Sequence, residues 1–131
     1  MSIPVGCSIN IMSSVAVAST GVVYGNSADL RMFRGFSLRI QATSATGTPD
    51  LQVEWEASNV RPSTEAAVDT NYVIPDEMNT SMDPIYPNLN DQLWHMKQLL
   101  PPPSNFARLR ITGVNSNPAD TLVTAELWLQ G

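Results

Sequence analysis

Cysteine and basic side chains are scarce in this chain. Cys7 is the single cysteine among 131 residues, so neither an internal disulfide nor a cysteine-based zinc framework can form within one chain, which fits synthesis in a reducing compartment. Seven basic residues stand against twelve acidic ones, giving a net charge of −5. Nucleic-acid backbones are bound by clustered Lys and Arg, and we therefore expect no nucleic acid as a partner.

Long apolar runs are absent as well. A membrane-spanning helix needs about 20 predominantly apolar residues, and no run in the sequence approaches that length. The N-terminal stretch also lacks the basic segment and the continuous apolar segment of a secretory signal. We expect a protein that is made in the cytoplasm without a secretory signal and that has no membrane partner.

The residue types that carry catalysis are few. His95 is the only histidine, and its bulky apolar neighbours Trp94 and Met96 favour a half-buried structural histidine over a catalytic base. A nucleophilic cysteine needs a histidine beside it, and Cys7 is far from His95 in the sequence. No glycine-rich phosphate loop, HExxH or CxxC pattern occurs. The sequence therefore predicts no enzyme, no catalytic residue and no cofactor.

Two glutamates, Glu54 and Glu56, alternate with apolar residues and so share the polar side of one predicted strand. Paired carboxylates can hydrolyse glycosides, but pairing with Arg39 on a neighbouring strand is the simpler interpretation. Further acids in an irregular region offer the oxygen ligands that Ca²⁺ prefers but match no calcium-loop motif. These are Asp69, Asp76, Glu77, Asp83 and Asp91. We predict no metal site.

The strongest positive signal is two-residue alternation of apolar and polar side chains. From Phe36 to Ser58 it runs through two strands that are separated by the turn-forming residues 44–50, as in strands with one buried face. Trp55 lies on the apolar side and is expected at the centre of the core. A second pair of alternating segments, at 107–111 and 122–130, is also separated by a turn. We interpret each pair as a β-hairpin.

Weaker strand patterns fill the rest of the chain. They cover 11–18, 20–24, 28–33, 71–74 and, as a strand in preference to a helix, 91–100. Together these segments predict an all-β fold, a two-sheet and jelly-roll-like β-sandwich of about seven to nine strands. The predicted organisation is an extended N-terminal arm at 1–10 and a single sandwich domain at 11–131.

One large aromatic side chain breaks the alternation. Trp128 lies on the polar side of the last predicted strand, together with Thr124 and Glu126, and exposed aromatic side chains often anchor subunit contacts. We therefore predict an interface at Trp128, Phe106 and Trp94 and at the arm residues Ile3, Pro4 and Val5.

Two segments carry a resemblance to a known group of proteins: VEWEASN at 53–59, and FARLRITGVNSNPADTLVTAELWLQ at 106–130. With the strands and the irregular stretch between them, they resemble the small β-sandwich structural proteins of tailed bacteriophages, several of which are capsid decoration or cement proteins. The resemblance implies a non-enzymatic virion protein that binds the outer surface of the capsid and stabilises it.

The same resemblance implies the major capsid protein as partner, a homo-oligomer with a trimer favoured over a dimer, and synthesis in the host cytoplasm. Two alternatives remain open. One is a head-fibre, tail or baseplate component. The other is a glycan-binding β-sandwich module, because the chain also resembles carbohydrate-binding and discoidin-like sandwiches; Trp94, Trp128 and Tyr72 are then the candidate sugar-stacking residues.

Overall fold

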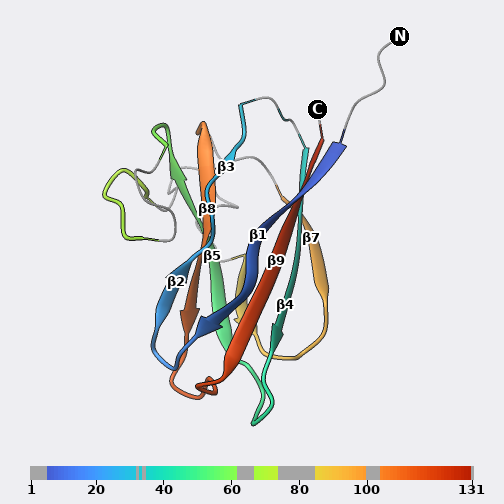
Figure 1. Cartoon of the computed structure of the whole chain (residues 1–131), viewed down its shortest axis with the longest axis vertical. Helices are drawn as coiled ribbons and strands as arrows, with labels where there is room; N and C mark the ends of the chain where they lie inside the picture. Colours follow the sequence, from blue (N-terminus) through green and yellow to red (C-terminus); the bar gives the residue numbers. More distant parts are fainter. Residues whose placement is uncertain are drawn as a thin grey trace.

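A computed structural model describes residues 6–31, 33, 35–61, 67–73, 85–99 and 104–130. These residues form nine β-strands and no helix, arranged as two antiparallel sheets that pack face to face (Figure 1). The two-sheet β-sandwich expected from the sequence is confirmed. Within the described residues, no helix could span a membrane.

The two sheets, here named A and B, have four and five strands. Sheet A has the order β1-β9-β4-β7, with the bounds Gly6–Val17, Thr121–Gln130, Gly35–Thr43 and His95–Leu99. Sheet B has the order β2-β8-β5-β6, with the bounds Val22–Tyr24, Phe106–Gly113, Leu51–Ser58 and Tyr86–Leu89, and β3 (Ala28–Asp29) also pairs with β8. Because β2 and β3 pair with successive parts of β8, they act as one interrupted strand, and the strand order is then that of a jelly roll.

The alternation in the sequence places side chains in the core as expected. Along β4 every second residue is buried, and Leu38 and Ile40 are fully enclosed. Trp55 is 8% exposed and belongs to the cluster between the sheets, as predicted. Inward-facing residues of β8 and β9 complete this core. Its burial removes apolar surface from water and so holds the two sheets together.

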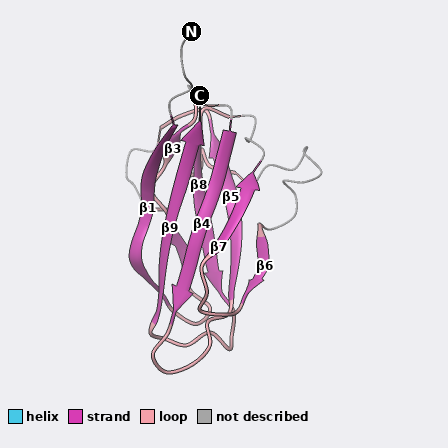
Figure 2. Cartoon of the chain, turned by 90° about the vertical axis from the view of Figure 1, so that its right-hand side faces the viewer, coloured by secondary structure: helices cyan, strands magenta, loops and turns pink. Residues whose placement is uncertain are grey.

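Both predicted hairpins are wrong. The consecutive strands β4 and β5 belong to opposite sheets, since β4 pairs with β7 and β9, and β5 pairs with β6 and β8. The second predicted pair, β8 and β9, is divided between the sheets in the same way. Alternation reports which side of a strand is buried, and two strands that face each other across a core show the same pattern as two that pair. The turns at 44–50 and 114–120 are therefore connections between sheets (Figure 2).

The sandwich begins earlier in the chain than predicted. Residues 6–10, assigned to the arm from the sequence, are the first part of β1 and pair with β9. Their side chains alternate, with Cys7 and Ile9 packed against the core. This alternation is short and follows a proline and a glycine, which is why it is weak in the sequence. The rest of the predicted arm, residues 1–5, lies outside the described residues.

The weaker strand predictions have mixed outcomes. Strands at 11–18 and 20–24 are confirmed as parts of β1 and β2, and the strand interpretation of 91–100 is confirmed by β7. The segment 28–33 contributes only the short β3. Of 71–74, the described residues contribute a single isolated bridge between Val73 and Ala57.

The outer face of sheet B is covered by the chain itself. Arg108 of β8 is 1% exposed, and its guanidinium lies between the rings of Tyr24 and Tyr72, 4.3 and 4.4 Å from their centroids. Its Nε donates to Glu56 at 2.9 Å and its Nη1 donates to the carbonyl of Ala67 at 2.7 Å. These contacts hold the segment that contains Ala67 and Tyr72 against sheet B (Figure 1). The described chain provides no such cover for sheet A (Figure 2).

Candidate binding surface on sheet A

The predicted interface residues do not form one exposed group in the structure. Trp128 and Trp94 are exposed, at 47% and 40%, on the side of sheet A that faces away from the core. The expectation of an exposed Phe106 is corrected: this side chain is only 6% exposed, because the guanidinium groups of Arg31 and Arg61 lie over its ring, 5.4 and 5.6 Å from the centroid. The other predicted residues, Ile3, Pro4 and Val5, lie outside the described residues.

Strand pairing places outward side chains of sheet A in rows that cross all four strands. From β1 to β7, one row consists of Asn10, Glu126, Arg39 and Met96, and the adjacent row consists of Ser8, Trp128, Ser37 and Gln98. Adjacent strands lie about 4.8 Å apart, so neighbours within a row can touch. Residues from distant parts of the sequence therefore form one continuous surface.

The indole of Trp128 lies against β1 at Gly6. A Cβ added at Gly6 would lie 2.2 Å from Cζ2 of the ring, which is far closer than two non-bonded carbons can approach, so glycine leaves the room that the ring occupies. Part of the indole therefore packs on the sheet, while the residue remains 47% exposed. The result is an aromatic surface whose position is set by the strand beside it.

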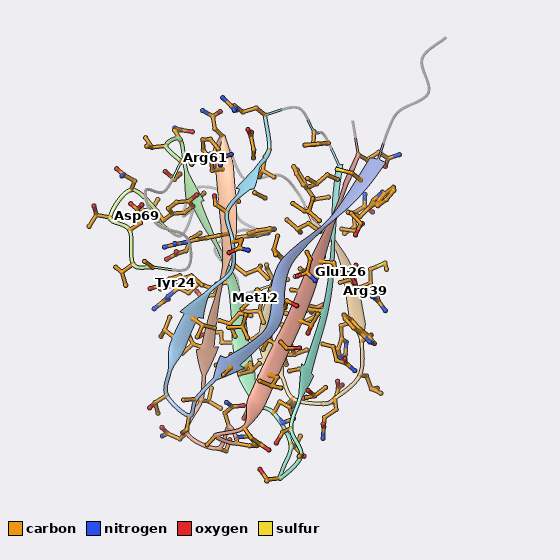
Figure 3. All side chains as sticks on the ribbon, viewed as in Figure 1. Met12, Tyr24, Arg39, Arg61, Asp69 and Glu126 are labelled. Carbon is orange, nitrogen blue, oxygen red and sulfur yellow. The ribbon has the colours of Figure 1, made fainter. Side chains whose placement is uncertain are left out.

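Arg39 is held from two sides. Its Nη1 donates to Oε1 of Glu126 at 2.5 Å, and the ring of Trp94 lies over the guanidinium, 3.8 Å from carbon Cζ to the centroid. Figure 3 shows Arg39 and Glu126 close together on the same side of the sheet. The hydroxyl of Ser8 donates to the other carboxylate oxygen of Glu126 at 3.3 Å. The two opposite charges cancel, so this part of the surface is polar but close to neutral.

Between these side chains lies a hollow of about 300 Å³. Its lining consists of Ser8, Ser37, Arg39, Met96, Glu126 and Trp128. The volume is at the lower end of the roughly 300–1,000 Å³ that small-ligand sites occupy. Trp128 and Met96 offer apolar surface, and the hydroxyl of Ser37 has no hydrogen-bond partner among the described residues. This arrangement can bind by stacking and hydrogen bonding.

Sequence reasoning found Trp128 but not the other residues that line the hollow. Ser8, Ser37, Arg39 and Glu126 occupy the polar sides of their strands, where a hydrated surface is the ordinary interpretation. The signal that brings them together is the strand order β1-β9-β4-β7, which alternation within single strands does not contain.

His95 lies next to the carboxylate of Asp91 at the rim of the sandwich. Its Nε2 lies 2.7 Å from Oδ1 of Asp91, and hydrogen bonds from His95 and from the backbone N–H of Leu93 lower the pKa of Asp91. The imidazole also packs near Tyr86, with ring centroids 5.7 Å apart. Its side chain is 33% exposed, which confirms the expected half-buried histidine. No serine or cysteine side chain of the described residues makes a hydrogen bond to this pair.

The predicted pairing of Glu54 and Glu56 with Arg39 is wrong. Both glutamates lie on β5 in sheet B, so their partners come from β8: Arg110 binds Glu54 at 3.3 Å, and Arg108 binds Glu56 at 2.9 Å. The error has the same origin as the predicted hairpin, because it assumed that β4 and β5 are neighbours in one sheet.

The acids considered for calcium are only partly described. Asp69 accepts a hydrogen bond from the backbone N–H of Asn71 at 2.8 Å, which is a local turn contact, and Asp91 binds His95. The other three, Asp76, Glu77 and Asp83, lie outside the described residues. In the part of the chain that the structure describes, no three His, Cys, Asp or Glu side chains are grouped so that they could hold a metal ion.

Neither a protein-family model nor a curated protein matches the sequence. The chain aligns with the solved structure of YomS, an SPBc2 prophage-derived protein, at 13% identity and a TM-score of 0.46, over 100% of this chain and 97% of that one. It also aligns with PliG of Aeromonas hydrophila, a periplasmic lysozyme inhibitor of g-type lysozyme, at 8% identity and a TM-score of 0.34, over 98% and 85% of the two chains. With TM-scores this low, function has to be inferred from the residues of this chain.

Proposed function

We propose that this chain is a non-enzymatic structural protein of a bacteriophage virion that binds the outside of the capsid and stabilises it. The observation that carries the proposal is the free edge of β1. This strand has 12 residues and pairs with β9 along one edge, while no described strand pairs with its other edge. Its register with β9 is regular over 6–10 and shifts only after Asn10.

A regular free edge is a template for a further strand. Its unpaired N–H and C=O groups can bind an extended segment of a partner, which is a common mode of protein recognition. The segment from 6 to 10 is also continuous with the apolar residues Ile3, Pro4 and Val5 in the sequence. Strand addition at this edge would join the protein to a neighbouring copy or to a capsid subunit.

The opposite edge of sheet A is less suited to strand addition. There β7 is only five residues long, and it directs Lys97 toward sheet B, where Nζ donates to the carbonyl of Ile85 at 2.9 Å and lies 5.3 Å from the ring centroid of Tyr86. Short strands and inward-pointing charges are features that protect sheet edges from unwanted pairing. The β1 edge is therefore the favoured contact.

The proposed partner is the major capsid protein. A net charge of −5 suits the exterior of a particle better than its DNA-filled interior, where phosphates would repel the protein. A trimer, favoured over a dimer, would contact several capsid subunits at once. After the first contact, each further contact is intramolecular and gains from a high effective concentration, which would hold neighbouring subunits together.

Co-sedimentation with expanded empty shells of the phage tests this function. The full chain should pellet with the shells, and deletion of residues 1–5 should weaken binding at least tenfold without changing the urea midpoint. Leu122→Ala, which removes an exposed side chain from the outer face of sheet A, is the matched control and should bind normally. A full chain that stays in the supernatant would reject capsid decoration in favour of a head-fibre, tail or baseplate role.

Light scattering tests the proposed assembly separately. We expect the mass of a trimer for the full chain and a lower mass after deletion of residues 1–5. A dimer would replace the trimer in the proposal. A shell that carries only isolated monomers would contradict the bridging role.

A further inference from the structure

The outer face of sheet A presents a positioned aromatic ring. The indole of Trp128 is placed against Gly6 and remains 47% exposed. A flat aromatic ring stacks well on the C–H-bearing side of a sugar ring, since both surfaces are apolar and leave water on contact. A side chain that is already fixed loses less conformational entropy when a ligand binds.

Polar atoms form a small part of the lining of the hollow, which is mainly apolar. Glu126 supplies carboxylate acceptors, Arg39 supplies guanidinium donors, and Ser37 supplies a hydroxyl without a protein partner among the described residues. Sugar hydroxyls need both donors and acceptors within reach. Because Arg39 and Glu126 already bind each other at 2.5 Å, the site has no free positive charge to offer to an anion.

We propose that this hollow binds one neutral pyranose ring of a glycan, with the sugar stacked on Trp128 and its hydroxyls bound by Arg39, Glu126 and Ser37. The volume of about 300 Å³ suits a small ligand. The ring of Trp94 on Arg39 extends the surface toward a second sugar residue. The site uses the face of sheet A, not the β1 edge, and so does not depend on the capsid contact.

Beside the mainly apolar hollow lie two exposed amides, which favour a neutral sugar over an apolar protein side chain. Asn10 and Gln98 lie at the outer ends of the two rows and are exposed. A protein partner that covered them with apolar surface would leave their amides without hydrogen bonds, which is costly, whereas a hydroxyl-rich ligand can satisfy them. An acidic sugar would face the carboxylate of Glu126 and should bind more weakly than its neutral counterpart.

A glycan array with neutral and sialylated structures is the first test, followed by NMR titration of the full chain with the methyl glycosides of glucose, galactose and N-acetylglucosamine. We expect saturable binding of a neutral sugar. Trp128→Ala should lower the affinity at least tenfold, and Trp128→Phe, which retains a smaller ring, should lower it less. Leu122→Ala, on the same side of β9 but outside the hollow, is the matched control and should bind normally.

Three results would overturn the proposal: no binding of any neutral glycan, unchanged affinity in a folded Trp128→Ala variant, or binding restricted to acidic sugars. The capsid proposal is separable from it. Deletion of residues 1–5 should leave sugar binding intact, and Trp128→Ala should leave shell binding intact. If Trp128→Ala instead abolishes shell binding and no sugar binds, the hollow is a capsid contact and the sugar site is rejected.

Discussion

The ring of Trp128 on β9 lies directly over the backbone of Gly6 on β1. The two residues are diagonal neighbours, since Trp128 pairs with Ser8 and Gly6 pairs with Gln130. Long aromatic side chains reach such diagonal positions in antiparallel sheets. The absence of a side chain at Gly6 therefore leaves the space that the exposed indole of Trp128 occupies on sheet A.

Gly6→Ala should displace this ring. The added Cβ would lie 2.2 Å from Cζ2 of Trp128, so the indole must move. Because the clashing atoms are the far end of a side chain that is 47% exposed, the cost in the free energy of unfolding should be small, about 0.5 kcal/mol. Gly35→Ala is the matched control, because its Cβ would meet Cβ of Gln130 at an ordinary 3.6 Å. Urea unfolding and the indole N–H shift of Trp128 measure both effects. Equal urea midpoints and equal indole N–H shifts in the two variants would contradict the contact between Gly6 and Trp128.

Arg108→Ala should be far more destabilising than Arg110→Ala. Removal of Arg108 leaves Glu56, which is 8% exposed, as an uncompensated buried charge, and such losses cost about 3–5 kcal/mol. The Arg110–Glu54 pair is longer, at 3.3 Å, and more exposed, so its loss should cost about 1 kcal/mol or less. Urea unfolding measures both. Similar losses in the free energy of unfolding would show that the burial of Arg108 does not determine its contribution to stability.

Arg108 also shows where sequence reasoning stops. The alternation at 107–111 puts Arg108 on the polar side of β8, opposite Leu109, and yet the side chain is buried. The cover comes from the segment that contains Tyr72 and, 41 residues before Arg108, Ala67. The sequence shows only a weak strand pattern there, at 71–74. Alternation within a strand predicts the side that faces the main core, but not whether another segment folds over the opposite side.

The same limit applies to the hollow on sheet A. Alternation in the sequence indicates the polar sides of β4 and β9, where Trp128 stands out because a large aromatic residue occupies such a position, but it assigns Ser8 of β1 to the arm. The hollow itself depends on β1, β9, β4 and β7 lying in that order. Strand order is set by packing between segments far apart in the chain, so the fold class was predictable and the site was not.

Trp55→Ala should cost about 3–5 kcal/mol of the free energy of unfolding, as expected for a large aromatic residue lost from a core. Trp55 is 8% exposed, and its indole N–H has no partner among the described residues, so its contribution comes from packing. Trp55→Phe should therefore cost much less, because it keeps most of the apolar volume and removes the unpaired N–H. A urea midpoint that is unchanged in Trp55→Ala would contradict the assignment of the core.

Asp29 should titrate at unusually low pH. The hydrogen bond from the side chain of Arg31, 2.6 Å from Nη2 to Oδ2, is the main cause that lowers the pKa of Asp29 from 3.8 to about 2. A lowered pKa means that the stability from this contact is present above pH 3.8 and is lost as the pH falls toward 2. Carboxyl NMR should show that Arg31→Gln raises the pKa of Asp29. Asp120, whose pKa is lowered mainly by Ser44 and Thr46, is the internal control and should not respond.

A double-mutant cycle distinguishes the observed pairing of β4 with β9 from the β4–β5 hairpin that the sequence indicates. In the structure Arg39 binds Glu126 across β4 and β9. Their side chains are 43% and 31% exposed, so the coupling energy between Arg39→Ala and Glu126→Ala should be about 0.2–1 kcal/mol. Glu54 lies in the opposite sheet and binds Arg110, so Arg39→Ala and Glu54→Ala should be additive. Coupling of Arg39 to Glu54 and additivity with Glu126 would mean that β4 and β5 pair as a hairpin, and the division of these strands between two sheets would then be incorrect.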